Sequence, residues 1–343
     1  MRQMRLILIG VLVLTSVAWS ADTVVVNGIE SKGVQVTGVD DCQLVFNNVG
    51  GVSEMAGLLD VESIDLGMEP LFTEAEGLAA QGKTDEAAAK YREALKDTPE
   101  DWVRELALLR RYQAIEAGGK VDDAVRLWKE ILEENDFSDN AAVLVPTHVA
   151  LAGDDANTAA LEALTELRGD EAVADNDALW ASITSLMITL AQIEELDDRQ
   201  MTLTDELLER MPAGESKTVV FRLAAAASKI SNGSSEHVTG ALEIITTDIE
   251  RYTGDQLPTA LFLRAQGYEK AAALASGEED LAAAHTHQLD ACIDYMYVLV
   301  FFAYDDNAPE AAYRAAVLNE AIGAEGPARR LYGVVAVGSM GLG

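Results

Sequence analysis

The sequence predicts a mainly α-helical protein, in which a solenoid of helical hairpins follows a small β-rich module. Three observations predict this fold class. Behind an apolar leader, short runs with apolar residues at every second position indicate strands. Beyond Leu66 the apolar period becomes helical, and small and aromatic residues return at a fixed spacing. Apolar residues make up 49% of the 343 residues, which is enough for a large core.

Residues 1–20 predict a signal peptide. Arg2 and Arg5 precede an apolar run that ends at Trp19, and Ala18 and Ser20 are small residues at the positions that determine cleavage. The run is shorter than the roughly 20 apolar residues that a membrane-spanning helix needs. We therefore expect an exported protein, periplasmic or secreted, with no membrane insertion after signal removal. A leader retained as an anchor is the alternative.

Residues 21–66 predict the β-rich module. The strand-like stretch Thr23–Val26 ends at Asn27-Gly28, and further stretches also end at Gly or Asn, which favour tight turns. This rhythm resembles the small SH3-like or Sm-like barrels that precede some exported bacterial repeat proteins. The resemblance implies a small β-barrel-like module.

Residues 67–343 contain an internal repeat of small, aromatic and turn residues. Gly82, Ala87 and Tyr91 recur 37 residues later as Gly119, Ala124 and Trp128, and two positions near the C-terminus recur at the same period. The repeat positions are Ala75, Gly82, Ala87, Tyr91, Pro99, Gly119, Ala124, Trp128, Ala291, Tyr295, Ala316, Gly323, Ala328 and Tyr332.

This pattern resembles the tetratricopeptide repeat (TPR), in which two antiparallel helices pack as a hairpin and successive hairpins form an α-α superhelix. The resemblance implies that Ala75 and Ala87 lie where the two helices approach closely, that Gly82 forms the turn between them, and that Tyr91 fills the wedge against the next hairpin. It covers residues 68–136 and 258–343. Between these blocks helical periodicity continues without the signature, so we expect degenerate hairpins there.

The resemblance also implies a partner-binding groove lined by the first helix of each hairpin. One apolar position recurs in it, beside polar and charged neighbours. The predicted partner-binding residues are Phe72, Glu76, Leu109, Gln113, Phe262, Gln266, Tyr313 and Val317. Apolar anchors beside carboxylates suit a peptide with apolar side chains and basic flanks. The alternative is that these residues pack in the core, as apolar residues at helical spacing commonly do.

The charge of the chain excludes some partners. It carries 58 Asp and Glu residues against 25 Lys and Arg, a formal net charge of −33. Nucleic-acid binding depends on Lys and Arg clusters that neutralise phosphates, so we expect no nucleic acid as a partner. Anionic membrane surfaces are disfavoured by the same sign of charge.

One segment matches an enzyme motif. Residues 77–84, GLAAQGKT, fit the phosphate-loop pattern G-x4-G-K-T. A real phosphate loop follows a buried strand, whereas helical periodicity precedes this one, and Gly82 already serves as the turn between two repeat helices. The histidines show no metal-binding spacing, since His285 and His287 point to different sides of a helix. We therefore predict no catalytic residue, no cofactor and no metal.

Together these patterns predict a non-enzymatic protein–protein interaction scaffold of the cell envelope or secreted space, which binds a partner along the concave face of the solenoid. Two alternatives are a nucleotide-binding enzyme that uses residues 77–84 and a structural component of a large surface assembly that associates with itself. The apolar stretch 291–304 predicts the most buried helix of the solenoid. Cys42 and Cys292 are either two free thiols or a disulfide.

Overall fold

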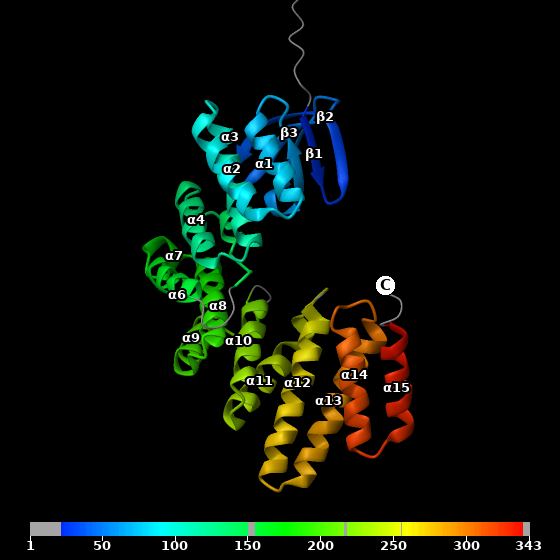
Figure 1. The fold of residues 1–343 in the computed structure, drawn as a ribbon. Coiled ribbons are helices and arrows are strands. Elements are labelled where there is room, and N and C mark those ends of the chain that lie inside the picture. Colours follow the sequence, from blue (N-terminus) through cyan, green and yellow to red (C-terminus); the bar gives the residue numbers. More distant parts are fainter. Residues whose placement is uncertain (1–21, 150–154, 216–217, 255, 339–343) are drawn as a thin grey trace, which may run out of the picture. The chain divides into compact units, whose positions relative to one another are not determined.

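The computed structural model describes residues 22–149, 155–215, 218–254 and 256–338. Over these residues a five-stranded antiparallel sheet precedes fifteen α-helices, so the chain is mainly α with a small N-terminal β module (Figure 1). The chain divides into two compact units, Met1–Ile115 and Glu116–Gly343, so the expected boundary at residue 66 lies inside the first. The predicted signal peptide lies outside the described residues.

The sheet of the first unit has its first four strands in chain order, and the fifth crosses over to pair with the first. Its order is β4-β3-β2-β1-β5, and every neighbouring pair is antiparallel, so β4 and β5 are its edges over the described residues. The elements are β1 (Asp22–Val26), β2 (Ile29–Asp40), β3 (Gln43–Asn47), β4 (Ser53–Gly57), the short 3-10 helix η1 (Leu58–Asp60) and β5 (Val61–Asp65).

Turn chemistry and alternation explain this sheet. Asn27 and Gly28 have φ values of 48° and 74° and join β1 to β2 in a two-residue turn, the conformation that an Asn-Gly pair favours. Leu44 and Phe46 of β3 are buried, as expected for side chains two apart on one face of a strand. The sequence therefore predicted β1, β2, β3, β5 and the first turn, but it did not predict β4.

Three helices complete the first unit: α1 (Pro70–Ala80), α2 (Thr84–Asp97) and α3 (Asp101–Ala117). The helices α1 and α2 pack on each other as a hairpin. Gly82 lies in the turn between them with φ of 72°, a left-handed conformation that Gly adopts without steric cost. Ala75 and Ala87 are fully buried.

The second unit is a succession of helices. Its elements are α4 (Val121–Glu134), α5 (Asp139–Ala142), α6 (Asp155–Arg168), α7 (Glu171–Asp175), α8 (Asp177–Ile193), α9 (Asp197–Arg210), α10 (Val219–Asn232), α11 (Ser235–Asp248), η2 (Ile249–Arg251), α12 (Gln256–Gly277), α13 (Leu281–Phe301), α14 (Ala308–Ala321) and α15 (Glu325–Gly338). Consecutive helices pack in pairs, as α8 with α9, α10 with α11, α12 with α13, and α14 with α15.

The helices α12 and α13 are unusually long. They have 22 and 21 residues, whereas α14 and α15 have 14 each. Phe262 and Tyr295 therefore stand thirty-three residues apart, whereas the corresponding Tyr313 and Tyr332 are nineteen apart. The difference is about four helical turns, two in each helix.

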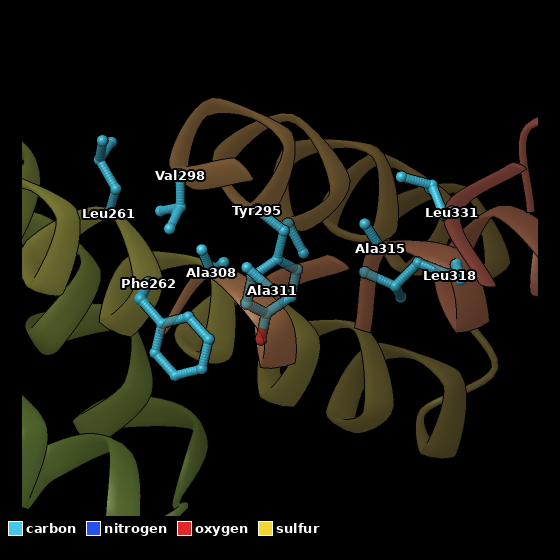
Figure 2. Close-up of a cluster of buried hydrophobic side chains, with 12 residues drawn as sticks. Leu261, Phe262, Tyr295, Val298, Ala308, Ala311, Ala315, Leu318 and Leu331 are labelled. Atoms are coloured by element: carbon cyan, nitrogen blue, oxygen red, sulfur yellow. The ribbon is translucent and has the colours of Figure 1, made fainter. Parts of the chain in front are cut away.

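The last four helices share a core of large side chains and alanines. Figure 2 shows Phe262 of α12 and Tyr295 of α13 beside Ala311 and Ala315 of α14. The rings of Phe262 and Tyr295 meet edge to face, with centroids 5.4 Å apart. The alanine row on α14 leaves room for these two rings, which is the packing role of small residues in such hairpins.

The helix α13 is not the most buried one, so that prediction is wrong. Tyr295 and Val298 are fully buried, but Ile293 and Val300 are each 61% exposed. The helix is apolar on both faces, and composition alone did not show which face is covered. No helix in the described part of the chain is long and apolar enough to cross a membrane.

Two substitutions within residues 77–84 should have opposite effects on stability. Gly82→Ala forces a Cβ into a left-handed turn and should lower the free energy of unfolding by about 1–2 kcal/mol. Gly77 lies within α1, where a Cβ meets no atom within 4 Å, so Gly77→Ala should raise it by about 0.5–1 kcal/mol. Urea denaturation measures both free energies of unfolding. Equal effects of the two changes would contradict the placement of Gly82 in a left-handed turn and of Gly77 within a helix.

Candidate functional site

The predicted partner-binding residues divide into buried and exposed ones. Phe72, Leu109 and Phe262 are 0%, 1% and 7% exposed, so these three pack in the core and offer no surface to a partner. The expectation that they line an open groove is therefore wrong, and the core alternative describes them. The reason is local, because Phe72 packs edge to face on Tyr91 and Phe262 does the same on Tyr295.

Glu76 is also buried, at 5% exposed, and it has an internal role. Its carboxylate accepts hydrogen bonds from the Tyr91 hydroxyl and from Arg110 Nε and Nη2, the last two at 2.6 and 2.7 Å. It also accepts the backbone N–H of Ile64 at 2.8 Å. Four donors on one carboxylate satisfy the charge where water is absent. We call Glu76, Tyr91 and Arg110 the first clasp.

The first clasp holds strand β5. Arg110 donates to the carbonyl oxygens of Val61 and Glu62 at 2.9 and 3.0 Å. Gln113, another predicted partner-binding residue, donates to the carbonyl oxygen of Leu58 at 3.1 Å. Because β5 is an edge strand, these side chains satisfy backbone groups that no neighbouring strand pairs.

Electrostatics favour the charged form of the first clasp. Burial alone would lower the pKa of Arg110, but the Glu76 carboxylate outweighs it and raises that pKa, so the guanidinium stays protonated. Burial raises the pKa of the Tyr91 hydroxyl, and the Glu76 charge raises it further. Tyr91 therefore remains a neutral hydrogen-bond donor to the carboxylate.

The same three residue types meet again in the second unit. Glu269 of α12 accepts hydrogen bonds from the Tyr295 hydroxyl at 2.6 Å and from Arg314 Nη1 at 2.8 Å. We call Glu269, Tyr295 and Arg314 the second clasp. Burial, then the Glu269 hydrogen bond, raises the pKa of Tyr295, so its hydroxyl too is a neutral donor.

The tyrosine and the arginine of the two clasps occupy corresponding repeat positions, whereas the carboxylates do not: Glu76 stands four residues after Phe72, and Glu269 stands seven residues after Phe262. Arg110 follows Tyr91 by nineteen residues, and Arg314 follows Tyr295 by the same number. The last hairpin repeats the aromatic and acidic part, since the rings of Tyr313 and Tyr332 lie 6.2 Å apart and Tyr332 donates to Glu320 at 3.0 Å. Arg110 and Arg314 were not predicted from the sequence, although an arginine nineteen residues after Tyr91 and after Tyr295 was a detectable signal.

The second clasp differs from the first in exposure. The side chains of Glu269 and Arg314 are 23% and 36% exposed, against 5% and 7% for Glu76 and Arg110. Tyr313 and Val317, on the same helix as Arg314, are 52% and 40% exposed. Gln266, on α12 with Glu269, is partly buried. Of the predicted partner-binding residues, Tyr313 and Val317 are exposed; Gln266 is partly buried, as is Gln113, whose amide is already hydrogen-bonded to Arg110 and to the Leu58 carbonyl.

A separate apolar surface lies on α13. Its shallow hollow, of about 310 Å³, is lined by Cys292, Ile293, Met296, Tyr297, Val300 and Phe301. Four of these side chains are large and at least 49% exposed. We call that set the α13 strip: Ile293, Tyr297, Val300 and Phe301.

The other candidate motifs show no functional arrangement in the described part of the chain. Residues 77–80 belong to α1 and Lys83 directly precedes α2, so a helix and not a strand leads into GLAAQGKT. Among the residues that the structure describes, no three His, Cys, Asp or Glu side chains are grouped to hold a metal ion. Cys42 and Cys292 are both free thiols, and burial raises the pKa of Cys42 to about 12.

No protein-family model matches this chain, and no curated protein matches it.

The two clasps should differ in their contribution to stability. Glu76→Ala leaves the Arg110 guanidinium buried without its carboxylate and should lower the free energy of unfolding by about 3–5 kcal/mol. Glu269→Ala leaves Arg314 partly hydrated and paired with Glu310 but removes the acceptor of the Tyr295 hydroxyl, so the loss should be about 1–2 kcal/mol. Chemical denaturation of both variants gives the comparison.

A double substitution serves as the control. Glu76→Leu with Arg110→Met removes both charges and should recover part of the stability that Glu76→Ala loses, because no uncompensated charge is left. Equal losses for Glu76→Ala and Glu269→Ala would contradict the difference in burial.

Proposed function

We propose that this protein is a non-enzymatic protein-binding scaffold, with a TPR-like solenoid as its helical part and an SH3-like β module before it. Left-handed glycines between paired helices, as at Gly82 and Gly323, support the repeat assignment. Three aromatic pairs also support it, because one tyrosine of each pair donates a hydrogen bond to a glutamate. The pairs are Phe72–Tyr91, Phe262–Tyr295 and Tyr313–Tyr332. The predicted signal peptide places the scaffold in the periplasm or the secreted space.

The observation that carries this proposal is the exposed surface beside the second clasp. Tyr313 and Val317 are large apolar side chains at repeat positions whose first-unit counterparts are covered. An aromatic residue beside a charged pair is the composition typical of a binding anchor. Nearby carboxylates of Glu269, Glu310 and Glu320 outnumber the Arg314 guanidinium, which favours a partner with apolar side chains and basic flanks.

Capture of a partner tests this proposal. Mature protein crosslinked in its own envelope should capture a defined protein, and Tyr313→Glu with Val317→Glu should lower the yield at least about tenfold, because both anchors are lost. Val52 is 59% exposed in the first unit, so Val52→Glu is the matched control and should capture as wild type does. Equal loss in the control would refute the assigned surface.

The α13 strip favours a second candidate, a structural role through self-association. In a chain of net charge −33, this strip presents four apolar side chains and no charged one. A two-fold symmetric interface brings the same patch of both copies together, and an uncharged apolar strip is complementary to itself.

Self-association through the strip should depend on salt in the direction opposite to that of an ion-paired interface. Raising ionic strength from about 0.02 to 0.15 M shortens the Debye length to about 8 Å and screens the repulsion between two acidic copies, so association should strengthen. Ile293→Glu with Val300→Glu should abolish it. Analytical ultracentrifugation measures both, and a wild-type protein that stays monomeric at 1 mM would rule this candidate out.

A further inference from the structure

The first clasp shows how this chain recognises an extended segment. Strand β5 lies against α1 and α3 with its backbone hydrogen-bonded by side chains: Glu76 accepts the N–H of Ile64, and Arg110 donates to the carbonyls of Val61 and Glu62. Backbone groups carry no sequence information, so this contact recognises an unpaired strand edge and not a particular sequence. The tyrosine hydroxyl fixes the carboxylate on its other side.

The second clasp has the same parts but holds no such segment among the described residues. Glu269 Oε1 accepts no hydrogen bond from any described residue, whereas both oxygens of Glu76 are used. Arg314 Nε is bonded to Glu310, whose side chain is 53% exposed. An exposed pair of this kind is weak, so a carbonyl oxygen can replace the Glu310 carboxylate on the guanidinium.

We propose that the second clasp binds an extended backbone segment of a partner protein, in the way that the first clasp binds β5. This inference rests on the proposed scaffold function and specifies its binding mode. Glu269 accepts a backbone N–H of the partner, Arg314 donates to its carbonyl oxygens, and Tyr313 and Val317 contact its apolar side chains. Bringing the segment in removes water from the clasp and strengthens each of these charged hydrogen bonds.

The position of Gln113 shows what the second clasp changes. Gln113 stands three residues after Arg110 and donates to the carbonyl oxygen of Leu58 in η1, just before β5, while Val317 stands three residues after Arg314. An apolar contact therefore replaces one backbone hydrogen bond. The acidic neighbours Glu310 and Glu320 add a preference for basic flanks, which β5 itself lacks because it carries Glu62 and Asp65.

The probe that tests this is a fluorescent peptide copied from residues 58–67, with Asp60→Lys, Glu62→Lys and Asp65→Lys. Full-length mature protein should bind it saturably in fluorescence anisotropy. A second peptide carries an N-methyl group on the Ile64 nitrogen, which deletes the one N–H that the clasp accepts. Its affinity should fall at least about tenfold, as for the loss of a hydrogen bond to a charged group.

Protein variants locate the binding at the second clasp. Arg314→Gln should also weaken binding of the unmethylated peptide at least about tenfold. Arg329→Gln is the matched control, because Arg329 forms a similar exposed pair with Glu325 one helix later and takes no part in the clasp. Far-UV circular dichroism checks that both variants fold, and the methylated peptide tests the same contact without any change in the protein.

Three results would overturn the inference: no saturable binding of the unmethylated peptide, equal affinity of the two peptides, or full affinity of Arg314→Gln. If Arg314→Gln instead abolishes self-association, the occupant is a second copy and the proposal of a separate partner falls. The crosslinking experiment distinguishes failure of this binding mode from failure of the proposed scaffold function. A partner captured equally by wild type and Arg314→Gln leaves the scaffold function standing and removes this binding mode, whereas no captured partner removes the scaffold function.

Discussion

The buried carboxylate of Glu76 is the constraint on which the first unit depends. A carboxylate removed from water is stable only where charge and hydrogen bonds replace its hydration, and here the replacements come from three places in the chain. Tyr91 supplies a hydroxyl from α2, Arg110 a guanidinium from α3, and Ile64 an N–H from β5. If any of these elements moved away, the Glu76 carboxylate would lose a hydrogen-bond donor or become exposed to water.

This constraint explains why the compact unit is larger than the sheet. A sheet of about 45 residues buries too little apolar surface to be stable alone, and its edge strand β5 would present unpaired backbone groups. The side chains of α1 and α3 satisfy that edge, and the sheet in turn covers residues that an isolated hairpin would expose. The unit consequently extends to Ile115 and not to the end of β5.

The sequence was sufficient for what depends on local periodicity. Strand alternation, the Asn27-Gly28 turn and the helical hairpins all follow from spacing and backbone preference, and helices form even in the poorly marked middle of the chain. The sequence was insufficient to predict which face of a helix other elements bury and which face meets solvent. Phe72 and Tyr313 occupy the same repeat position, yet one is fully buried and the other is 52% exposed.

The reason lies in contacts between distant residues. Arg110 reaches the carbonyl of Val61 across 49 positions, and neither residue has a local signal for that contact. The strip on α13 was missed for a related cause: Ile293 and Tyr295 are both large and apolar, and only the neighbouring helices decide which of them meets solvent. Periodicity defines faces, whereas the packing of other elements decides which face becomes a surface.

The contrast between the two clasps shows how burial sets the role of one chemical arrangement. An ion pair in water is weak because solvent competes for both charges, and the same pair becomes strong and orienting once a segment excludes that solvent. At the first clasp the chain supplies the excluding segment itself, so the pair is a fixed part of the fold. At Glu269 and Arg314 the charges remain partly hydrated, so the pair is weaker in the free protein and would strengthen on binding of the extended segment that we propose. In the binding mode proposed above, the residue types that stabilise the first unit give a partner its affinity in the second.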